Sequence, residues 1–456
     1  GLKSQGSQAW TQDSPGVLST PDQFDRFGFS LGAGDFNNDG FDDLAVGVLG
    51  EEVAGLLAGA VHVLYGSDQG LTAAGDQLWS LGTTGVAGDP TPNGYYGNSL
   101  ATGNFGNGPA DDLAVGAPGQ HVDLNEYAGG LSVLYGSGDG LEAAGSLYVT
   151  QATDQMDGDP DLNDFFAWSL AAGDFGGSDK DDLAVGVPGD EVLGPKAGSV
   201  HILFGSNQGV ESTGSQYINE TTAGIVEKWG PNAGDNFGWA LAAGNFRDSS
   251  RTDLAIGVPG KDINGDDSAG GVVVVSGDDD GLNSTTAQFL SEDHNQAPGE
   301  TEPSEAYGSV LTAANFGRTN RSDLAIAVPY NDVDGIESVG LVHVVYGSNN
   351  GFEEGADEIW HTAKPSIRQS PHQNEQFGSS LTGANFGKSS QADLAIGAPI
   401  DSVGGDVGAG IVNCIYGKAN GLKAKDNQIW HQDKAGIPGQ AEEQDFFGDG
   451  TPLVFA

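Results

Sequence analysis

One unit of about 70 residues recurs six times in this sequence, and the recurrence constrains the fold more than any other feature. Each copy opens with an aromatic residue that begins a segment rich in small residues. The six openings are Phe27, Tyr96, Phe166, Phe237, Tyr307 and Phe377, so successive openings lie 69 to 71 residues apart. Self-similarity at a fixed period indicates a repeat architecture, in which each copy is one supersecondary unit.

Each repeat contains four short apolar runs separated by glycine, asparagine and aspartate. The second run reads DLAVG or a close variant, and the third resembles the VHVLYG at 61–66. Runs rich in β-branched and aromatic residues with such boundaries indicate a four-stranded antiparallel sheet. These sheets are apolar on both faces, and radial packing of sheets around an axis buries both. We therefore predict an all-β propeller with six complete four-stranded antiparallel blades.

The charge balance excludes several classes of partner. The chain has 64 acidic and 17 basic side chains and a formal net charge of −47. Such a field repels nucleic acid and anionic lipid, and it attracts divalent cations. No apolar run approaches ~20 residues, so we expect no direct membrane insertion. No signal peptide is recognised, and the initial glycine is what a processed or engineered start would leave. The single cysteine, Cys414, excludes an internal disulfide and is expected to be a buried thiol.

The repeats resemble FG-GAP repeats, which form the blades of the integrin alpha-subunit head and of bacterial relatives. The resemblance lies in the Phe-Gly openings and in the Gly-Ala-Pro at 116–118 and 397–399, and it covers nearly the whole chain. Some positions depart from the pattern: Ala167 replaces the glycine of one opening, Tyr96 and Tyr307 replace phenylalanine, and Leu49 stands where proline is expected. The resemblance implies one propeller domain over 1–456.

The two ends of the chain leave the number of blades open. The segment GLKSQGSQAWTQD at residue 1 matches GLKAKDNQIWHQD at 421, which is a fourth-strand segment. The resemblance implies that 1–26 closes the propeller, so the last blade has a candidate outer strand from either end. Residues 446–456 read as a partial seventh repeat, whose first and fourth strands alone could not form a ladder. Six blades are predicted for a complete chain and seven for a fragment.

The acidic loop DFNNDGFDD at 35–43 differs from its counterparts in the other repeats. Oxygen donors occupy its positions 1, 3, 5, 7 and 9, the seventh through its backbone carbonyl: Asp35, Asn37, Asp39, Phe41 and Asp43. Gly40, at position 6, permits the sharp turn. Calcium accepts such a set of hard oxygen donors, whereas magnesium demands stricter octahedral geometry. We predict a calcium site here, where the resemblance also places one; an Asx-rich hairpin turn without metal is the alternative.

The other five loops have lost the third and fifth donors but keep an aspartate at position 9. These aspartates are Asp112, Asp182, Asp253, Asp323 and Asp393. We expect each to accept hydrogen bonds from loop amides. Three loops carry cations that would replace the ion: Arg247 with Arg251, Arg318 with Arg321, and Lys388.

A second acidic cluster alternates oxygen donors at Asp157, Asp159, Asp161 and Asn163. A solvated loop is favoured for it over a metal site, because Pro160 interrupts it and it has no turn glycine.

No phosphate loop, zinc-binding helix or nucleophile elbow is present in the sequence. His62, His201 and His343 recur at one position of the third run, which indicates a shared packing role. We predict a non-enzymatic, calcium-binding, secreted or cell-surface module for protein binding or cell adhesion. Its partner would be an extracellular protein or glycan, bound by the long loops between blades. The alternative is a polysaccharide-binding lectin or carbohydrate-active enzyme in which Trp168 or Trp239 stacks on sugar.

Overall fold

The computed structural model describes residues 1–106, 108–225, 230–292, 301–352, 355, 357–365, 367 and 370–450. These described residues contain β-strands, turns and bends and no helix. Consequently they include no helix that is long and apolar enough to cross a membrane. Two compact units divide the chain: Trp10–Trp239 with Gly277–Thr285, and Gly1–Ala9 with Ala240–Ser276 and Thr286–Ala456. The prediction of a single domain over 1–456 stays a prediction, and the units are described separately.

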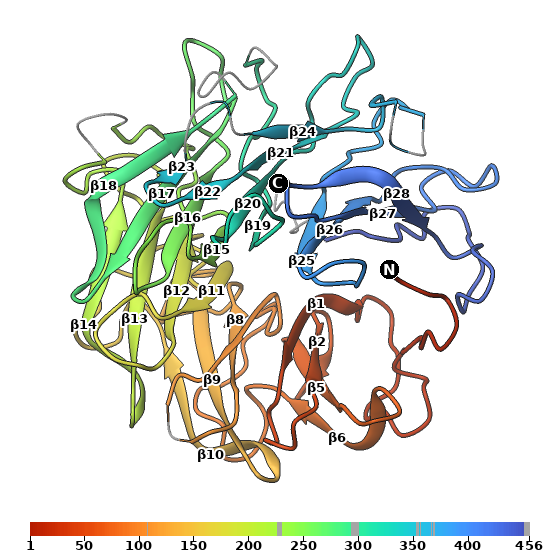
Figure 1. Cartoon of the computed structure of the whole chain (residues 1–456). Helices are drawn as coiled ribbons and strands as arrows, with labels where there is room; N and C mark the ends of the chain where they lie inside the picture. Colours follow the sequence, from red (N-terminus) through yellow and green to blue (C-terminus); the bar gives the residue numbers. More distant parts are fainter. Residues whose placement is uncertain are drawn as a thin grey trace. The chain divides into compact units, whose positions relative to one another are not determined.

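The first unit contains three four-stranded antiparallel sheets, which we name blades 1 to 3 (Figure 1). Blade 1 consists of β1 (Phe27–Gly34), β2 (Asp43–Val48), β5 (Ala60–Tyr65) and β6 (Thr72–Trp79). Blade 2 consists of β7 (Ser99–Gly103), β8 (Asp112–Ala117), β9 (Gly130–Ser137) and β10 (Gly140–Val149). Blade 3 consists of β11 (Ser169–Gly173), β12 (Asp182–Val187), β13 (Ser199–Ser206) and β14 (Gly209–Asn219). A short hairpin, β3 (Glu52–Val53) with β4 (Leu56–Leu57), connects β2 to β5.

The second unit contains blades 4 to 6, except for Gly277–Thr285, which comprise the end of β17, the turn after it and the first half of β18. Blade 4 consists of β15 (Leu241–Gly244), β16 (Asp253–Val258), β17 (Gly271–Asp278) and β18 (Gly281–Leu290). Blade 5 consists of β19 (Leu311–Ala314), β20 (Asp323–Val328), β21 (Leu341–Val345) and β24 (Glu358–Trp360), and β22 (Gly347–Ser348) pairs separately with β23 (Gly351–Phe352). Blade 6 consists of β25 (Ser380–Ala384), β26 (Asp393–Ala398), β27 (Ile411–Tyr416) and β28 (Lys423–Trp430). The predicted all-β propeller of six four-stranded antiparallel blades is thus confirmed.

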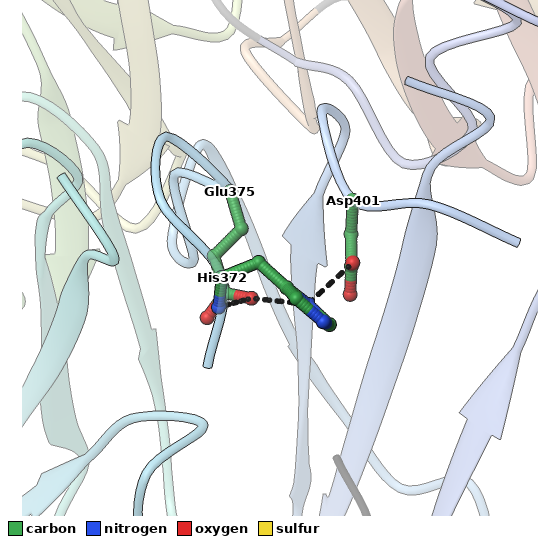
Figure 2. Close-up of side chains that lie close together, drawn as sticks. All are labelled: His372, Glu375 and Asp401. Atoms are coloured by element: carbon green, nitrogen blue, oxygen red, sulfur yellow. Dashed lines mark hydrogen bonds and ion pairs between the residues drawn. The ribbon is translucent and has the colours of Figure 1, made fainter. Parts of the chain in front are cut away.

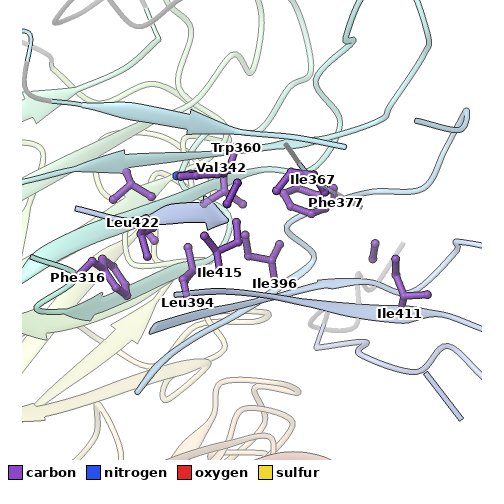
Figure 3. Close-up of a cluster of buried hydrophobic side chains, with 14 of the residues drawn as sticks. Phe316, Val342, Trp360, Ile367, Phe377, Leu394, Ile396, Ile411, Ile415 and Leu422 are labelled. Atoms are coloured by element: carbon purple, nitrogen blue, oxygen red, sulfur yellow. The ribbon is translucent and has the colours of Figure 1, made fainter. Parts of the chain in front are cut away.

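The second strand of each blade is apolar on both faces because both faces are covered. All six residues of β12 are buried, and so are all six of β16 and β20. In blades 5 and 6 the buried side chains of facing sheets form one cluster, which includes Val342, Trp360, Leu394 and Ile396 (Figure 3). Phe377, the aromatic residue that opens the sixth repeat, is fully buried in the same cluster. Phe377 therefore fills the space where blade 6 packs on blade 5.

Both ends of the chain lie against blade 6. Its outer strand is β28, and residues 1–26 contribute no strand. The N–H of Leu2 donates to the Tyr416 hydroxyl (3.2 Å), and Gln428 donates to the Leu2 carbonyl (3.3 Å). The N–H of Leu422, just before the fourth strand of blade 6, donates in the same way to the Tyr346 hydroxyl (2.9 Å). The N-terminal segment thus docks on blade 6 as the fourth-strand segment of a following repeat does.

The C-terminal segment repeats the contact of a blade opening. The N–H of Phe447 donates to the Ala409 carbonyl (3.0 Å), as the N–H of Phe166 does to the Ala128 carbonyl (3.0 Å). This agrees with the start of a partial seventh repeat, whose residues 451–456 lie outside the described part of the chain.

Candidate functional site

The loop between β1 and β2 gathers three of the predicted calcium ligands. The N–H of Asp39 donates to Asp35 Oδ1 (2.9 Å) and to Asn37 Oδ1 (3.0 Å), so these two oxygens lie side by side. The N–H of Gly40 donates to Asp35 Oδ2 (2.9 Å), and the positive φ of 89° at Gly40 is a backbone conformation that glycine adopts without strain. Asp39 Oδ1 accepts from the N–H of Phe41 (2.9 Å). One N–H thus bonds to both Asp35 and Asn37, and Asn37 Nδ2 in turn donates to Asp39 Oδ2 (3.1 Å), so the loop brings the side chains of positions 1, 3 and 5 together.

Asp43, the fourth predicted side-chain ligand, is buried beneath this loop. Its Oδ2 accepts from the N–H of Phe36 (2.9 Å) and its Oδ1 from the N–H of Gly66 (2.8 Å). Burial raises the pKa of Asp43 to about 6 against these two bonds, and the charges of Asp39 and Asp35 raise it further. Asp43 therefore ties the loop to β5 while remaining within the electrostatic reach of the other two carboxylates.

The two hydrogen bonds that Asp43 accepts, which we call the aspartate clamp, recur at position 9 of other loops, as the sequence led us to expect. In each case one carboxylate oxygen accepts from the N–H seven residues earlier and the other from an N–H at the end of the third strand. The aspartates with both bonds are Asp43, Asp112, Asp182, Asp323 and Asp393. Asp253 accepts from the N–H of Phe246 (3.0 Å) and pairs with Arg247 Nε (3.5 Å). The ninth aspartate is thus a structural element of every blade.

Four of the loops without the third and fifth donors are closed by a hydrogen bond. Their first residue is asparagine, and its Nδ2 donates to the carbonyl four residues later. The pairs are Asn104 with Gly108 (3.1 Å), Asn245 with Ser249 (3.2 Å), Asn315 with Thr319 (3.2 Å) and Asn385 with Ser389 (3.1 Å). An asparagine amide donates where an aspartate can only accept. These loops therefore hold their shape through a neutral hydrogen bond.

The loop cations lie in several different environments. Lys180, from the loop of blade 3, donates to Asn104 Oδ1 (2.6 Å) and to the Gly108 carbonyl (3.2 Å) in the loop of blade 2. Arg318 lies over the Tyr346 ring (3.9 Å from the ring centre) and Lys388 over the Tyr416 ring (3.5 Å). Lys180, which the sequence did not single out, thus occupies the place of an ion between positions 1 and 5 of a loop, whereas Arg318 and Lys388 lie on tyrosine rings.

The second acidic cluster has the character of a solvated loop. The side chains of Asp157, Asp159 and Asp161 are exposed. Asp164, which follows them, is fully buried, and its Oδ2 accepts from the N–H of Asp161 (2.7 Å). Burial, and then the charge of Asp190, raise the pKa of Asp164 to about 7 against that hydrogen bond.

A further group of residues was missed in the sequence. An acidic side chain two residues before the opening aromatic accepts from the N–H three residues before itself. In the six repeats the acidic residues are Asp25, Asp164, Asp235, Glu305 and Glu375, and Asp445 has the same place before Phe447 of the partial seventh repeat. Aligning the repeats on their openings reveals this position, because five of the six openings carry an acidic residue there and the Tyr96 opening carries Gly94.

At the opening of blade 6 this position is part of a group of three candidate metal ligands. His372, Glu375 and Asp401 place one ligand atom each within 4.8 Å of one another (Figure 2). His372 Nδ1 lies 3.2 Å from Asp401 Oδ1 and 3.7 Å from a Glu375 carboxylate oxygen. Burial, and then the charge of Asp401, raise the pKa of Glu375 to about 8 against its hydrogen bonds. Within the described residues, Asp35, Asp39 and Asp43 are not gathered as tightly.

The recurring histidines are structural, as predicted. His62 pairs with Asp76 (3.1 Å) and His343 with Asp357 (3.0 Å), and both imidazoles are buried. His201 packs against the rings of Phe166 and Tyr217, and burial lowers its pKa to about 3.

Trp168, a residue of the alternative sugar-binding hypothesis, is only 4% exposed. Its ring lies 4.9 Å from that of Trp239, measured between centres, so its indole is used in packing.

Comparison with known proteins agrees with the repeat architecture. The family profile of the FG-GAP repeat matches residues 27–64. Phosphatidylinositol-glycan-specific phospholipase D of Bos taurus is 28% identical over 245 residues, which cover 53% of this chain and 27% of that protein. Integrin alpha-5 of Xenopus laevis is 27% identical over 244 residues (52% and 20%), and integrin alpha-PS5 of Drosophila melanogaster is 41% identical over 99 residues (21% and 9%). The matches thus span about a quarter or less of these relatives. Residues 27–64 are thus an FG-GAP repeat, and the chain, whose described residues form six four-stranded propeller blades, is similar over about half of its length to integrin alpha subunits and to this phospholipase D.

Proposed function

We propose that this chain is a calcium-binding, non-enzymatic FG-GAP propeller of the secreted or cell-surface kind, which binds an extracellular protein and acts in adhesion. The observation that carries the proposal is the loop at 35–43, where hydrogen bonds bring the side chains of Asp35, Asn37 and Asp39 together on one turn. Similarity to integrin alpha subunits supports an adhesive role, and the net charge of −47 favours uptake of cations.

The residues of the loop fit a calcium ion. Asp35, Asn37 and Asp39 would supply side-chain oxygens and Phe41 its carbonyl. Asp43 already accepts two amide bonds, but a carboxylate has about four lone-pair sites and can still coordinate. Bound calcium would neutralise carboxylates that now repel one another, and it would hold the turn between β1 and β2.

The second candidate is a propeller that binds glycan, alone or beside a catalytic domain. The similarity to a phospholipase D whose name states specificity for phosphatidylinositol-glycan favours it. The burial of Trp168 leaves less aromatic surface for stacking on sugar, and we therefore place protein binding first.

A binding screen separates the two candidates. The chain, immobilised in calcium or in chelator, is presented to a panel of extracellular matrix proteins and to a glycan array, and a parallel assay measures hydrolase and lyase activity. We expect calcium-dependent binding to protein. Binding to glycans alone, or turnover of a glycan, would overturn the proposed function.

A further inference from the structure

The junction between blades 5 and 6 contains two buried carboxylates that approach one imidazole. Glu375 lies in the turn before β25 and is 1% exposed; Asp401 follows β26 and is 4% exposed. Thr362, just after β24, donates its hydroxyl to Glu375 Oε1, and the N–H of Ser402 donates to Asp401 Oδ1 (2.7 Å). The side chain of His372 is 60% exposed and reaches both carboxylates from solvent (Figure 2).

Other blade junctions have different residues and hydrogen bonds at the repeat positions of Glu375 and Asp401. Before blade 1, the Gln12 amide bridges Asp25 Oδ2 (3.0 Å) and Glu51 Oε2 (2.9 Å). Before blade 5, the position of Asp401 is taken by Asn331, whose amide donates to Glu305. In blade 4 the residue at that position is Lys261. Blade 6 instead combines two carboxylates with a threonine and a solvent-facing histidine.

The distances from the imidazole nitrogen to the two carboxylates match the ligand spacing around a small tetrahedral ion. Ligands 2.0–2.2 Å from a tetrahedral zinc ion lie about 3.3–3.6 Å from one another. The distances from His372 Nδ1 to the two carboxylates are 3.2 and 3.7 Å, which bracket this range. Hydrogen bonds and burial already fix the two carboxylates. Binding of an ion would therefore require only a small movement of the exposed His372 imidazole.

We propose that His372, Glu375 and Asp401 form a zinc site, separate from the loop at 35–43. An imidazole nitrogen with two carboxylates suits zinc, whereas calcium prefers six to eight oxygen ligands. Because His372 faces solvent, a fourth position stays open to water or to a ligand from a partner. Zinc would join the turn at 372–375 to the end of β26.

Zinc titration of the whole chain tests this site. The protein is first saturated with calcium, so that hard oxygen sites are filled, and zinc chloride is then titrated in a calorimeter. We expect one zinc ion per chain. His372→Ala should weaken zinc binding by at least about 100-fold, since loss of an outer-shell partner alone typically costs 10–100-fold. His121→Ala, which removes a histidine from a loop of blade 2, is the matched control and should bind zinc as the parent does.

Two further measurements make the outcome decisive. Histidine-selective NMR should show zinc shifting the Nδ1 resonance of His372 while those of His62 and His201 stay in place. Asp401→Asn keeps the shape of the side chain and should also weaken zinc binding, which covers the case of a misfolded alanine variant. Absence of zinc binding, equal affinity in His372→Ala and the parent, or displacement of zinc by an equal concentration of calcium would each overturn the proposal. None of these results bears on the calcium loop, which is tested separately.

Discussion

Replacing Asp182 with alanine tests the role of the ninth loop aspartate. Asp182 begins β12 and is fully buried. It accepts from the N–H groups of Phe175 (2.8 Å), Gly176 (3.1 Å) and Gly205 (2.9 Å). The alanine variant would leave these three backbone donors without their acceptor in the interior of blade 3.

The size of the effect follows from these bonds. A buried donor left unsatisfied costs about 1–3 kcal/mol, so three of them could cost as much as about 9 kcal/mol. Water entering the vacated space, together with the relief of desolvating a buried charge, reduces this sum, and we expect a loss of about 3–5 kcal/mol. That is a large fraction of the stability of an ordinary domain, about 5–15 kcal/mol.

Urea unfolding followed by tryptophan fluorescence measures this loss. Asp179→Ala is the matched control, because Asp179 lies in the same loop with its side chain exposed. The control should stay within about 0.5 kcal/mol of the parent. A loss of unfolding free energy below about 1 kcal/mol for Asp182→Ala, or one equal to that of the control, would refute the stabilising role of the aspartate clamp.

Three further predictions concern other sites. Asp164 has a folded pKa of about 7, raised from 3.8 mainly by burial, so its contribution to stability is present below pH 4 and is lost as the pH rises through 7. The melting temperature should therefore rise on acidification from pH 8 to 5. Asp164→Asn should remove a part of this rise worth at most about 2.7 kcal/mol, because stability changes by about 1.36 kcal/mol for each pH unit between 7 and 5; an unchanged pH profile would contradict the assignment. Lys180→Met removes two hydrogen bonds to the loop of blade 2 and should destabilise the chain by about 1–3 kcal/mol without creating a calcium site, as urea unfolding and calorimetry will show. Asn385→Asp replaces the donor to the Ser389 carbonyl with an acceptor and should cost about 1 kcal/mol, and gain of calcium binding in this variant would mean that the missing donors do not matter.

The repeat pattern was sufficient to predict the blades. Each second strand combines a β-branched apolar run with a preceding aspartate, and local propensity, burial and loop chemistry agree at all six copies. The survival of that aspartate in loops without other donors, such as the one ending at Asp393, indicated a structural use. The same reasoning applied to Asp43 would have predicted its two amide bonds beside the proposed coordination.

Contacts between repeats could not be predicted in the same way. Lys180 reaches Asn104 across 76 positions of sequence, and only the packing of two blades brings them together. His372 and Asp401 belong to different loops that meet at a junction. Nothing in a local pattern marks such pairs, because their geometry is set by the tertiary structure.

Calcium titration calorimetry of the intact chain tests the central claim most directly, namely that the loop at 35–43 binds the ion and the hydrogen-bonded loops do not. We predict one tight site, its loss in Asp39→Ala and an unchanged isotherm in Ser389→Ala. At calcium about 100-fold above its dissociation constant, the bound ion should add about 2.7 kcal/mol of stability, and chelation should lower the melting temperature accordingly. Four or more equivalent sites, no site, or one tight site that persists in Asp39→Ala would contradict the claim.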